Sequence, residues 1–237
     1  MESLVFADKE ITLLLNSFYT SWQDLFFYLI TSRIVWLPLY VALLWMIFRR
    51  QGGKGLMTLL VVGVLILLAD RLTSGLMKPL FERLRPSHDP MLQYMVHIVA
   101  DYRGGLYGFA SSHAANTFAV WGFFSFVVRN VGLNISLGIW ALLNCYGRIY
   151  QGVHFLGDII VGALIGLLVA RLVYEAYLHI VLHFFVISHH NKRTLKSGLA
   201  RSFGQDEPTI VTYTFWLTIA FILIFISLLS KYYGATI

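Results

Sequence analysis

The sequence predicts an all-α membrane protein, a polytopic bundle of about six transmembrane helices with an N-terminal interfacial helix in front of it. Hydrophobic residues make up 58% of the 237 residues and charged residues only 13%, which is unlike a soluble globular domain. The apolar residues form separate stretches of about 17 to 25 residues, the length that crosses a bilayer. Most charges lie at the ends of these stretches, so we expect the chain to reside in a membrane.

The first 25 residues predict an amphipathic helix that lies on the membrane surface, with a further transmembrane span as the alternative. Between residues 9 and 25, leucine and aromatic side chains are interspersed with polar ones. The start of the chain, MESLVFADKE, is acidic, the reverse of the basic start of a signal peptide, so we expect the segment to be retained. We therefore divide the chain into this segment, residues 1–25, and a transmembrane domain, residues 26–237.

Six stretches are predicted to span the membrane. They run from Phe26 to Phe48, Leu56 to Leu76, His113 to Val128, Leu133 to Tyr150, Leu156 to about Val173, and Ile210 to Leu229. The fifth contains Gly162 and Gly166, a spacing that favours a close contact between two helices. Asp70 lies inside the second stretch, where a lone acid is costly, and we expect it to pair with an arginine rather than to act in catalysis.

The distribution of basic residues predicts the orientation in the membrane. Six spans divide the connections between two faces, and the face richer in lysine and arginine is expected to be cytoplasmic. Its basic residues are Arg49, Arg50, Lys54, Arg129, Lys192, Arg193, Lys196 and Arg201. The opposite face then receives the N-terminus, the long connection from Met77 to Ser112 and the turn around Gln151 and Gly152.

The connection from Met77 to Ser112 carries a motif at each end. It opens with KPLFERLRP, which places Lys78 and Arg85 at the membrane surface, where a single cation is most often an anchor to the headgroups. It closes with GFASSHAAN, where Ser111 and Ser112 precede an apolar stretch at the place of a helix N-cap. Backbone NH groups and the helix dipole there would face an anion, although a serine at this place can also be a plain cap.

A third motif, GRIYQGVHFLGD, runs from the end of the fourth span to the start of the fifth. His154 and Asp158 are four residues apart, which predicts that they share one helical face. The carboxylate can then accept a hydrogen bond from one imidazole nitrogen and leave the other free to attack. A histidine near a helix start is by itself more often a polar residue with a local partner, so the nearby acid carries the argument.

The predicted topology places all three motifs on the same, non-cytoplasmic side, where they could converge on one phosphate. Lys78, Arg85 and Arg148 would neutralise its oxygens. In order and spacing the motifs resemble the signature of the type 2 phosphatidic acid phosphatase superfamily, KxxxxxxRP, PSGH and SRxxxxxHxxxD. The charged and imidazole positions are all kept. The departures from the signature are Ala110 for Pro, Ser112 for Gly and Gly147 for Ser.

The resemblance implies a mechanism. His154 would attack the phosphorus and form a phosphohistidine, Asp158 would orient its imidazole, and His113 would be the general acid and then activate water. The groups that would stabilise the transferring phosphoryl are Lys78, Arg85, Arg148 and the backbone of Ser111 and Ser112. No cofactor or metal is expected, since the sequence contains no HExxH, no carboxylate cluster typical of magnesium and no Walker loop.

Two further arginines of the long connection, Arg83 and Arg103, either neutralise the surface or extend the basic rim toward a second phosphate. Surface neutralisation is the expected role of each. The single cysteine, Cys145, excludes an intrachain disulfide and is expected to be a small apolar helix residue.

The six spans indicate a substrate whose tail stays in the bilayer. The SSHAAN wording and the short N-terminus resemble the bacterial undecaprenyl diphosphate phosphatase branch, which implies that substrate and a site on the extracytoplasmic face of the bacterial inner membrane. Phosphatidylglycerol phosphate, phosphatidic acid and lipid A phosphates remain open. Although the net charge is +6, its placement at the ends of spans argues against a nucleic acid partner, and the oligomeric state is not predicted. A transporter or channel, a vanadate-dependent haloperoxidase and a membrane scaffold are the alternatives.

Overall fold

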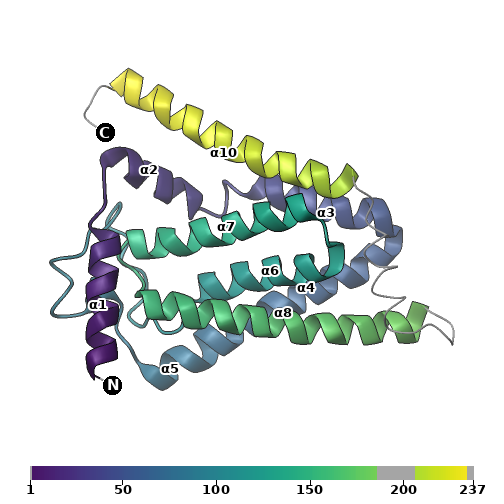
Figure 1. Ribbon diagram of the computed structural model, residues 1–237, viewed down its shortest axis with the longest axis horizontal. Coiled ribbons are helices and arrows are strands. Elements are labelled where there is room, and N and C mark those ends of the chain that lie inside the picture. Colours follow the sequence, from purple (N-terminus) through teal and green to yellow (C-terminus); the bar gives the residue numbers. More distant parts are fainter. Residues whose placement is uncertain (1, 186–205, 234–237) are drawn as a thin grey trace.

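The computed structural model describes residues 2–185 and 206–233 and contains helices but no strand in these ranges. The long helices run back and forth along one direction, and α1 lies across one end of the bundle they form (Figure 1). The long helices are α3 (Leu37–Gln51), α4 (Gly55–Asp70), α6 (Ser112–Val128), α7 (Val131–Tyr150), α8 (Leu156–Phe185) and α10 (Asp206–Tyr233). The all-α prediction is confirmed.

The N-terminal helix differs from its predicted bounds. Instead of one helix over residues 9–25, α1 covers Glu2–Asn16 and α2 covers Ser21–Ile30. The break occurs because Thr20 is extended and its hydroxyl accepts a hydrogen bond from the Gln23 NH at 3.2 Å, which caps α2. At the end of α1, the buried Asn16 amide donates to the carbonyl oxygens of Ile149 and Tyr150, so α1 is tied to the end of α7.

The predicted continuous span from Phe26 to Phe48 is wrong, because the structure divides it into α2 and α3. Residues 31–36, which we call the α2–α3 turn, separate the two helices. The Trp36 indole NH donates to the Ile30 carbonyl oxygen at 2.6 Å and satisfies the end of α2. Pro38 lies in the first turn of α3, where its missing NH costs no hydrogen bond.

By length and composition, three helical stretches of the described chain could cross a membrane: Leu37–Phe81, Leu156–Ile180 and Asp206–Lys231. The first is folded into a hairpin of α3 and α4 at the short turn Gly52–Lys54, where Gly52 adopts a φ of 53°. Beyond α4 it continues through the π-helical segment Arg71–Met77 into α5 (Lys78–Phe81).

Two predictions about residues inside the spans have different outcomes. The close helix contact predicted for Gly162 and Gly166 is confirmed, since a methyl group there would collide with the backbone oxygen of Ser111, the N-cap of α6, or of Ala115 in α6. Asp70 accepts a hydrogen bond from the Ser74 hydroxyl at 3.2 Å. Within the described chain it has no ion pair with an arginine, so that expectation was wrong.

The three motifs lie at one end of the bundle, and the described basic residues predicted to face the cytoplasm lie at the other. α6 and α8 begin, and α7 ends, at the end that α1 crosses (Figure 1). Arg49, Arg50, Lys54 and Arg129 lie at the other end, in the last turn of α3 and in the connections α3–α4 and α6–α7. The remaining basic residues assigned to that side, Lys192, Arg193, Lys196 and Arg201, lie outside the described residues. The three motifs therefore share one end of the fold.

Candidate active site

His154 and Asp158 lie side by side at the start of α8, and both are buried. His154 Nδ1 is 3.2 Å from Asp158 Oδ2, and the same oxygen accepts the Phe155 NH at 3.0 Å. The two residues do not share a helical face as predicted, because α8 begins at Leu156 and His154 precedes it. The carboxylate in the first turn of α8 instead reaches back to the imidazole, so the predicted pairing holds.

The other imidazole nitrogen faces a cation. His154 Nε2 is 3.1 Å from Arg85 Nη1, which also donates to the Val153 carbonyl oxygen at 3.0 Å. An arginine can only donate, so Nε2 carries the lone pair and Nδ1 carries the proton. Burial, and next the positive charge of Arg85, lower the pKa of His154 well below its usual range. The imidazole is therefore neutral near pH 7, as a nucleophile requires.

Three cations at this end of the bundle have only neutral partners. The Lys78 ammonium donates to the hydroxyls of Ser112, at 3.1 Å, and Ser74, at 3.3 Å. Arg148 contacts Gln151 Oε1 and the Thr31 carbonyl oxygen, each at 3.4 Å. Within the described chain neither they nor Arg85 pair with a carboxylate, and the Nε atoms of both arginines are buried without a partner. Because a buried charge without a counter-charge is costly, the site is suited to an anion.

Arg83 differs from these three cations because two carboxylates neutralise it. Its Nη1 is 3.0 Å from Asp158 Oδ1 and its Nη2 is 2.6 Å from Asp8 Oδ2. Asp8 also accepts the Gly157 NH at 2.8 Å, which links α1 to the first turn of α8. The surface neutralisation expected of Arg83 is therefore wrong. Its guanidinium lies over the Phe155 ring at 4.1 Å and binds Asp158, the carboxylate that pairs with His154.

Sequence reasoning missed Asp8 because it is 75 positions from Arg83, and only the path of α1 across the bundle brings them together. The start of the chain is acidic, but nothing in the sequence around Asp8 indicates which residue its carboxylate binds. Arg103, the other arginine of the long connection, donates to the Ser87 carbonyl oxygen at 3.0 Å. It thus braces the connection internally.

The second motif begins α6, as predicted. Ser111 is the N-cap, its hydroxyl accepts the Ala114 NH at 3.4 Å, and its own NH donates to the Asp158 carbonyl oxygen at 3.0 Å. The Ser112 hydroxyl bridges Lys78 and Ser74, which it approaches to 2.6 Å. The second motif is therefore joined to both of the others.

His113, in the first turn of α6, lies where two cavities meet. The larger, of about 880 Å³, reaches from Lys78, Arg85 and Ser112 to apolar side chains of α3, α4 and α6, and we call it the phosphate cavity. The smaller, of about 430 Å³, is lined by Arg33, Tyr102 and Arg148, and we call it the basic cavity. Arg148 thus lines the basic cavity, whereas Lys78 and Arg85 line the phosphate cavity.

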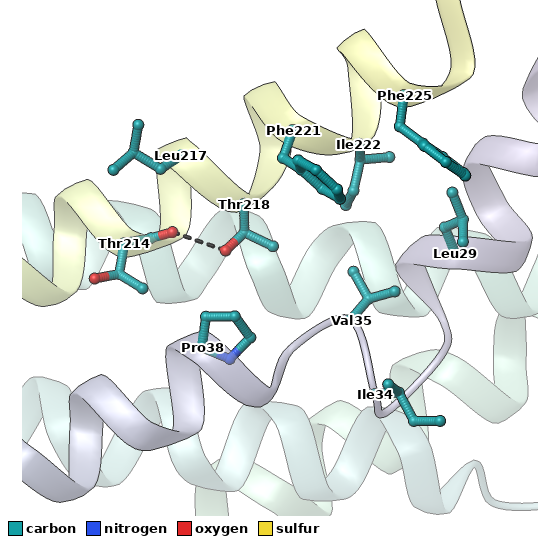
Figure 2. Close-up of a pocket in the computed structure, with 10 residues that line it drawn as sticks. All are labelled: Leu29, Ile34, Val35, Pro38, Thr214, Leu217, Thr218, Phe221, Ile222 and Phe225. Carbon is teal, nitrogen blue, oxygen red and sulfur yellow. Dashed lines mark hydrogen bonds between the residues drawn. The ribbon is translucent and has the colours of Figure 1, made fainter. Parts of the chain in front are cut away.

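A third cavity lies on the other side of the α2–α3 turn, between that turn and α10 (Figure 2). We call it the α10 groove; it has a volume of about 530 Å³ and its lining is apolar apart from two threonines. It is lined by Leu29, Ile34, Val35, Pro38, Thr214, Leu217, Thr218, Phe221, Ile222 and Phe225. None of the predicted site residues belongs to it.

The α2–α3 turn also accounts for one departure from the family signature. A methyl group added at Gly147 would lie 2.6 Å from Thr31 Cγ2, so the serine of the signature does not fit here. Thr31 fills that space and receives a hydrogen bond from the Gln151 amide at 2.8 Å. The sequence could not show that Thr31 occupies the space of the signature serine, because Thr31 was predicted to lie inside a continuous span.

No group of three His, Cys, Asp or Glu side chains in the described part of the chain could hold a metal ion. Apart from Asp158, which holds His154, and Asp70, which lines the phosphate cavity, the polar groups described above are cations, imidazoles and hydroxyls, which suit a phosphate.

A sequence model described as the PAP2 superfamily matches residues 56–181, which include all three motifs. A lipid A 4'-phosphatase of Porphyromonas gingivalis is 37% identical over 182 residues, which are 76% of each chain. A second lipid A 4'-phosphatase, of Bacteroides thetaiotaomicron, is 30% identical and the match covers 95% of this chain and 97% of that one. The crystal structure of a transmembrane PAP2 type phosphatidylglycerolphosphate phosphatase of Bacillus subtilis has a TM-score of 0.56 and 27% identity, with 78% of this chain and 90% of that chain covered.

Proposed function

This chain belongs to the PAP2 superfamily and is a multi-pass membrane lipid phosphatase; from that premise we propose that it cleaves lipid phosphates through a phosphohistidine on His154. The observation that supports this most directly is that each imidazole nitrogen of His154 has its own partner. Nδ1 is held by Asp158, and Nε2 faces the cationic side of the site. The transporter and scaffold alternatives lose their basis, since the curated relatives are named phosphatases.

In the proposed first step, Nε2 of His154 attacks the phosphorus in line with the lipid oxygen. The phosphorus–nitrogen bond forms as the phosphorus–oxygen bond breaks, and His113 gives its proton to the departing oxygen. The Arg85 guanidinium, which contacts Nε2 in the structure, transfers its hydrogen bond to a phosphoryl oxygen. Lys78 and Arg148 stabilise the other oxygens, and Asp158 stabilises the positive charge on His154.

In the second step, His113 takes a proton from a water molecule that attacks the phosphohistidine. This releases inorganic phosphate and restores the neutral imidazole of His154. Proton transfer in both directions by one residue requires that His113 lie beside the leaving oxygen and then beside the water. Its place in the lining of both the phosphate cavity and the basic cavity supports this role.

For the substrate, we propose a phosphorylated lipid of the lipid A class, since two relatives with this name match most of the chain. The apolar walls of the phosphate cavity suit a lipid tail beside a cationic headgroup site. Undecaprenyl diphosphate is the second candidate, favoured by the sequence SSHAAN in the second motif. We place the enzyme in the bacterial inner membrane with its site on the extracytoplasmic face, because Arg49, Arg50, Lys54 and Arg129 lie at the other end.

The decisive experiment measures phosphate release by the purified protein in detergent micelles with a chelator present. The substrates are lipid A, undecaprenyl diphosphate, phosphatidylglycerol phosphate and phosphatidic acid. We expect His154→Ala to lower kcat about ten-thousandfold or more on every substrate that the wild type cleaves. Arg129→Gln, at the far end of the bundle, is the control and should behave as the wild type.

Full activity of His154→Ala, or an absolute need for added divalent metal, would contradict the mechanism. The ranking of the substrates by kcat/KM tests the lipid separately. A higher value for undecaprenyl diphosphate than for lipid A would replace the first candidate by the second.

A further inference from the structure

The α2–α3 turn is fixed against the active site by hydrogen bonds. The Gln151 amide donates to the Thr31 hydroxyl at 2.8 Å, and Arg148 Nη2 contacts the Thr31 carbonyl oxygen at 3.4 Å. Trp36, at the other end of the turn, is anchored to the Ile30 carbonyl oxygen. The turn interrupts a stretch apolar enough to be one helix, and its position is set by the residues of the third motif.

The turn presents Arg33 to the basic cavity. Arg33 is exposed, and in the described chain its guanidinium has no hydrogen bond or ion pair. No carboxylate lines this cavity, whereas Arg148 and the Tyr102 ring, 5.9 Å from the Arg148 guanidinium, do. Two arginines that face one cavity without a counter-charge repel each other, so the cavity favours an anionic occupant.

The position of the basic cavity relative to the reaction indicates what this occupant is. Lys78 and Arg85 line the phosphate cavity alone, Tyr102 and Arg148 line the basic cavity alone, and His113 and Arg33 line both. In the proposed function, His113 protonates the leaving oxygen. The part of the headgroup beyond that oxygen can therefore extend into the basic cavity.

We propose that Arg33, with the Tyr102 hydroxyl, binds a second anionic group of the substrate headgroup, a phosphate or phosphodiester on the leaving-group side of the bond that is cleaved. This inference rests on the proposed function and narrows its substrate class. Lipids whose headgroup carries a second anionic group are then preferred over simple phosphate monoesters. The arginine fork supplies two parallel donors to such a group, which a lysine cannot reproduce.

The test compares three lipids with the same acyl chains. Phosphatidic acid has one phosphate, diacylglycerol diphosphate has a second phosphate directly attached, and phosphatidylglycerol phosphate has a phosphodiester three carbons away. We expect Arg33→Gln to lower the ratio of kcat/KM for one or both of the doubly anionic lipids to that for phosphatidic acid about tenfold, the loss of one charge-assisted contact. Arg33→Lys should give a smaller fall in the ratio, and Arg129→Gln should leave it unchanged.

An inhibition measurement complements the substrate comparison and does not depend on which lipid is cleaved. Inhibition by inorganic pyrophosphate and by inorganic phosphate is compared in the wild type and in Arg33→Gln, and the advantage of pyrophosphate should disappear in the variant. An unchanged substrate ratio in Arg33→Gln, including an equal loss on all three lipids, would overturn the subsite. His154→Ala keeps the two proposals apart, since His154-dependent cleavage with an unchanged ratio refutes the subsite alone. If the wild type cleaves only lipid A or undecaprenyl diphosphate, the comparison of pyrophosphate with phosphate is made on that substrate. If it cleaves none of these lipids, the proposed function falls and the subsite with it.

Discussion

Residues 31–33 of the α2–α3 turn line the basic cavity, whereas Ile34 and Val35 line the α10 groove on the other side of the same turn (Figure 2). On the first side, hydrogen bonds to Gln151 and Arg148 fix the backbone. On the second side, contacts with α10 are apolar and Ile34 is 76% exposed. Hydrogen bonds require one geometry, while apolar contacts can be exchanged for lipid tails, so substitutions on the two sides should differ strongly in effect.

The largest effect is expected at Asp8 of α1, whose carboxylate holds Arg83 beside the active-site acid Asp158. Asp8→Asn removes one of the two carboxylates that neutralise Arg83, so Asp158 loses its fixed partner and His154 its orientation. We expect kcat to fall about 10- to 100-fold with a smaller change in KM, as for other residues that orient a catalytic group. Asp8→Glu should restore part of the loss. Glu10→Gln, an exposed acid of the same helix, is the matched control, and an equal loss there would refute a specific role of Asp8.

The next effect tests the packing of the turn against α7. Gly147→Ser introduces the residue of the family signature where Thr31 leaves no space, and should lower the free energy of unfolding by about 1–3 kcal/mol. Thr31→Ala should relieve the clash, so that the double variant is more stable than Gly147→Ser alone. Chemical unfolding in detergent provides the comparison. If the two losses simply added, the contact between these residues would have no energetic weight.

A smaller effect is expected in the pH dependence of kcat/KM, which reports on His154. Because the pKa of His154 is lowered below 6.5, the imidazole stays unprotonated, and the loss of kcat/KM from protonation of the nucleophile should occur only below that pH. Arg85→Gln removes a cation that opposes protonation, so the residual activity should begin to fall at a higher pH than in the wild type. A pH profile of kcat/KM for both proteins measures this. An acid limb that moved downward in the variant would contradict the assigned effect of Arg85.

The smallest effect is expected in the α10 groove. Phe221→Ala removes a side chain that is 67% exposed and whose contacts detergent or lipid tails can replace. We expect kcat/KM to stay within about twofold of the wild type and stability to change by less than about 1 kcal/mol. A tenfold loss of activity would show that the two sides of the turn are coupled.

The sequence was sufficient for those features that depend on local composition and spacing. Hydropathy gave the all-α fold, because each residue's transfer into a bilayer is nearly independent of its distant neighbours. Spacing indicated the His154–Asp158 pair, the Ser111 cap and the close contact at Gly162 and Gly166, since each is signalled by residues only a few positions apart in the chain. Alternation of the spans was enough to bring three motifs to one end.

Only the tertiary structure decided which polar groups meet across the bundle. Hydropathy predicted one span over residues 26–48, because it does not record that the Trp36 indole and the Thr31 hydroxyl can satisfy a broken helix. It did not reveal Asp8, whose partner Gly157 is 149 positions away, nor place Arg33 beside the site. Hydrogen bonds and ion pairs depend on the exact meeting of two atoms, and that meeting is set by how α1 and the α2–α3 turn pack against the ends of α7 and α8.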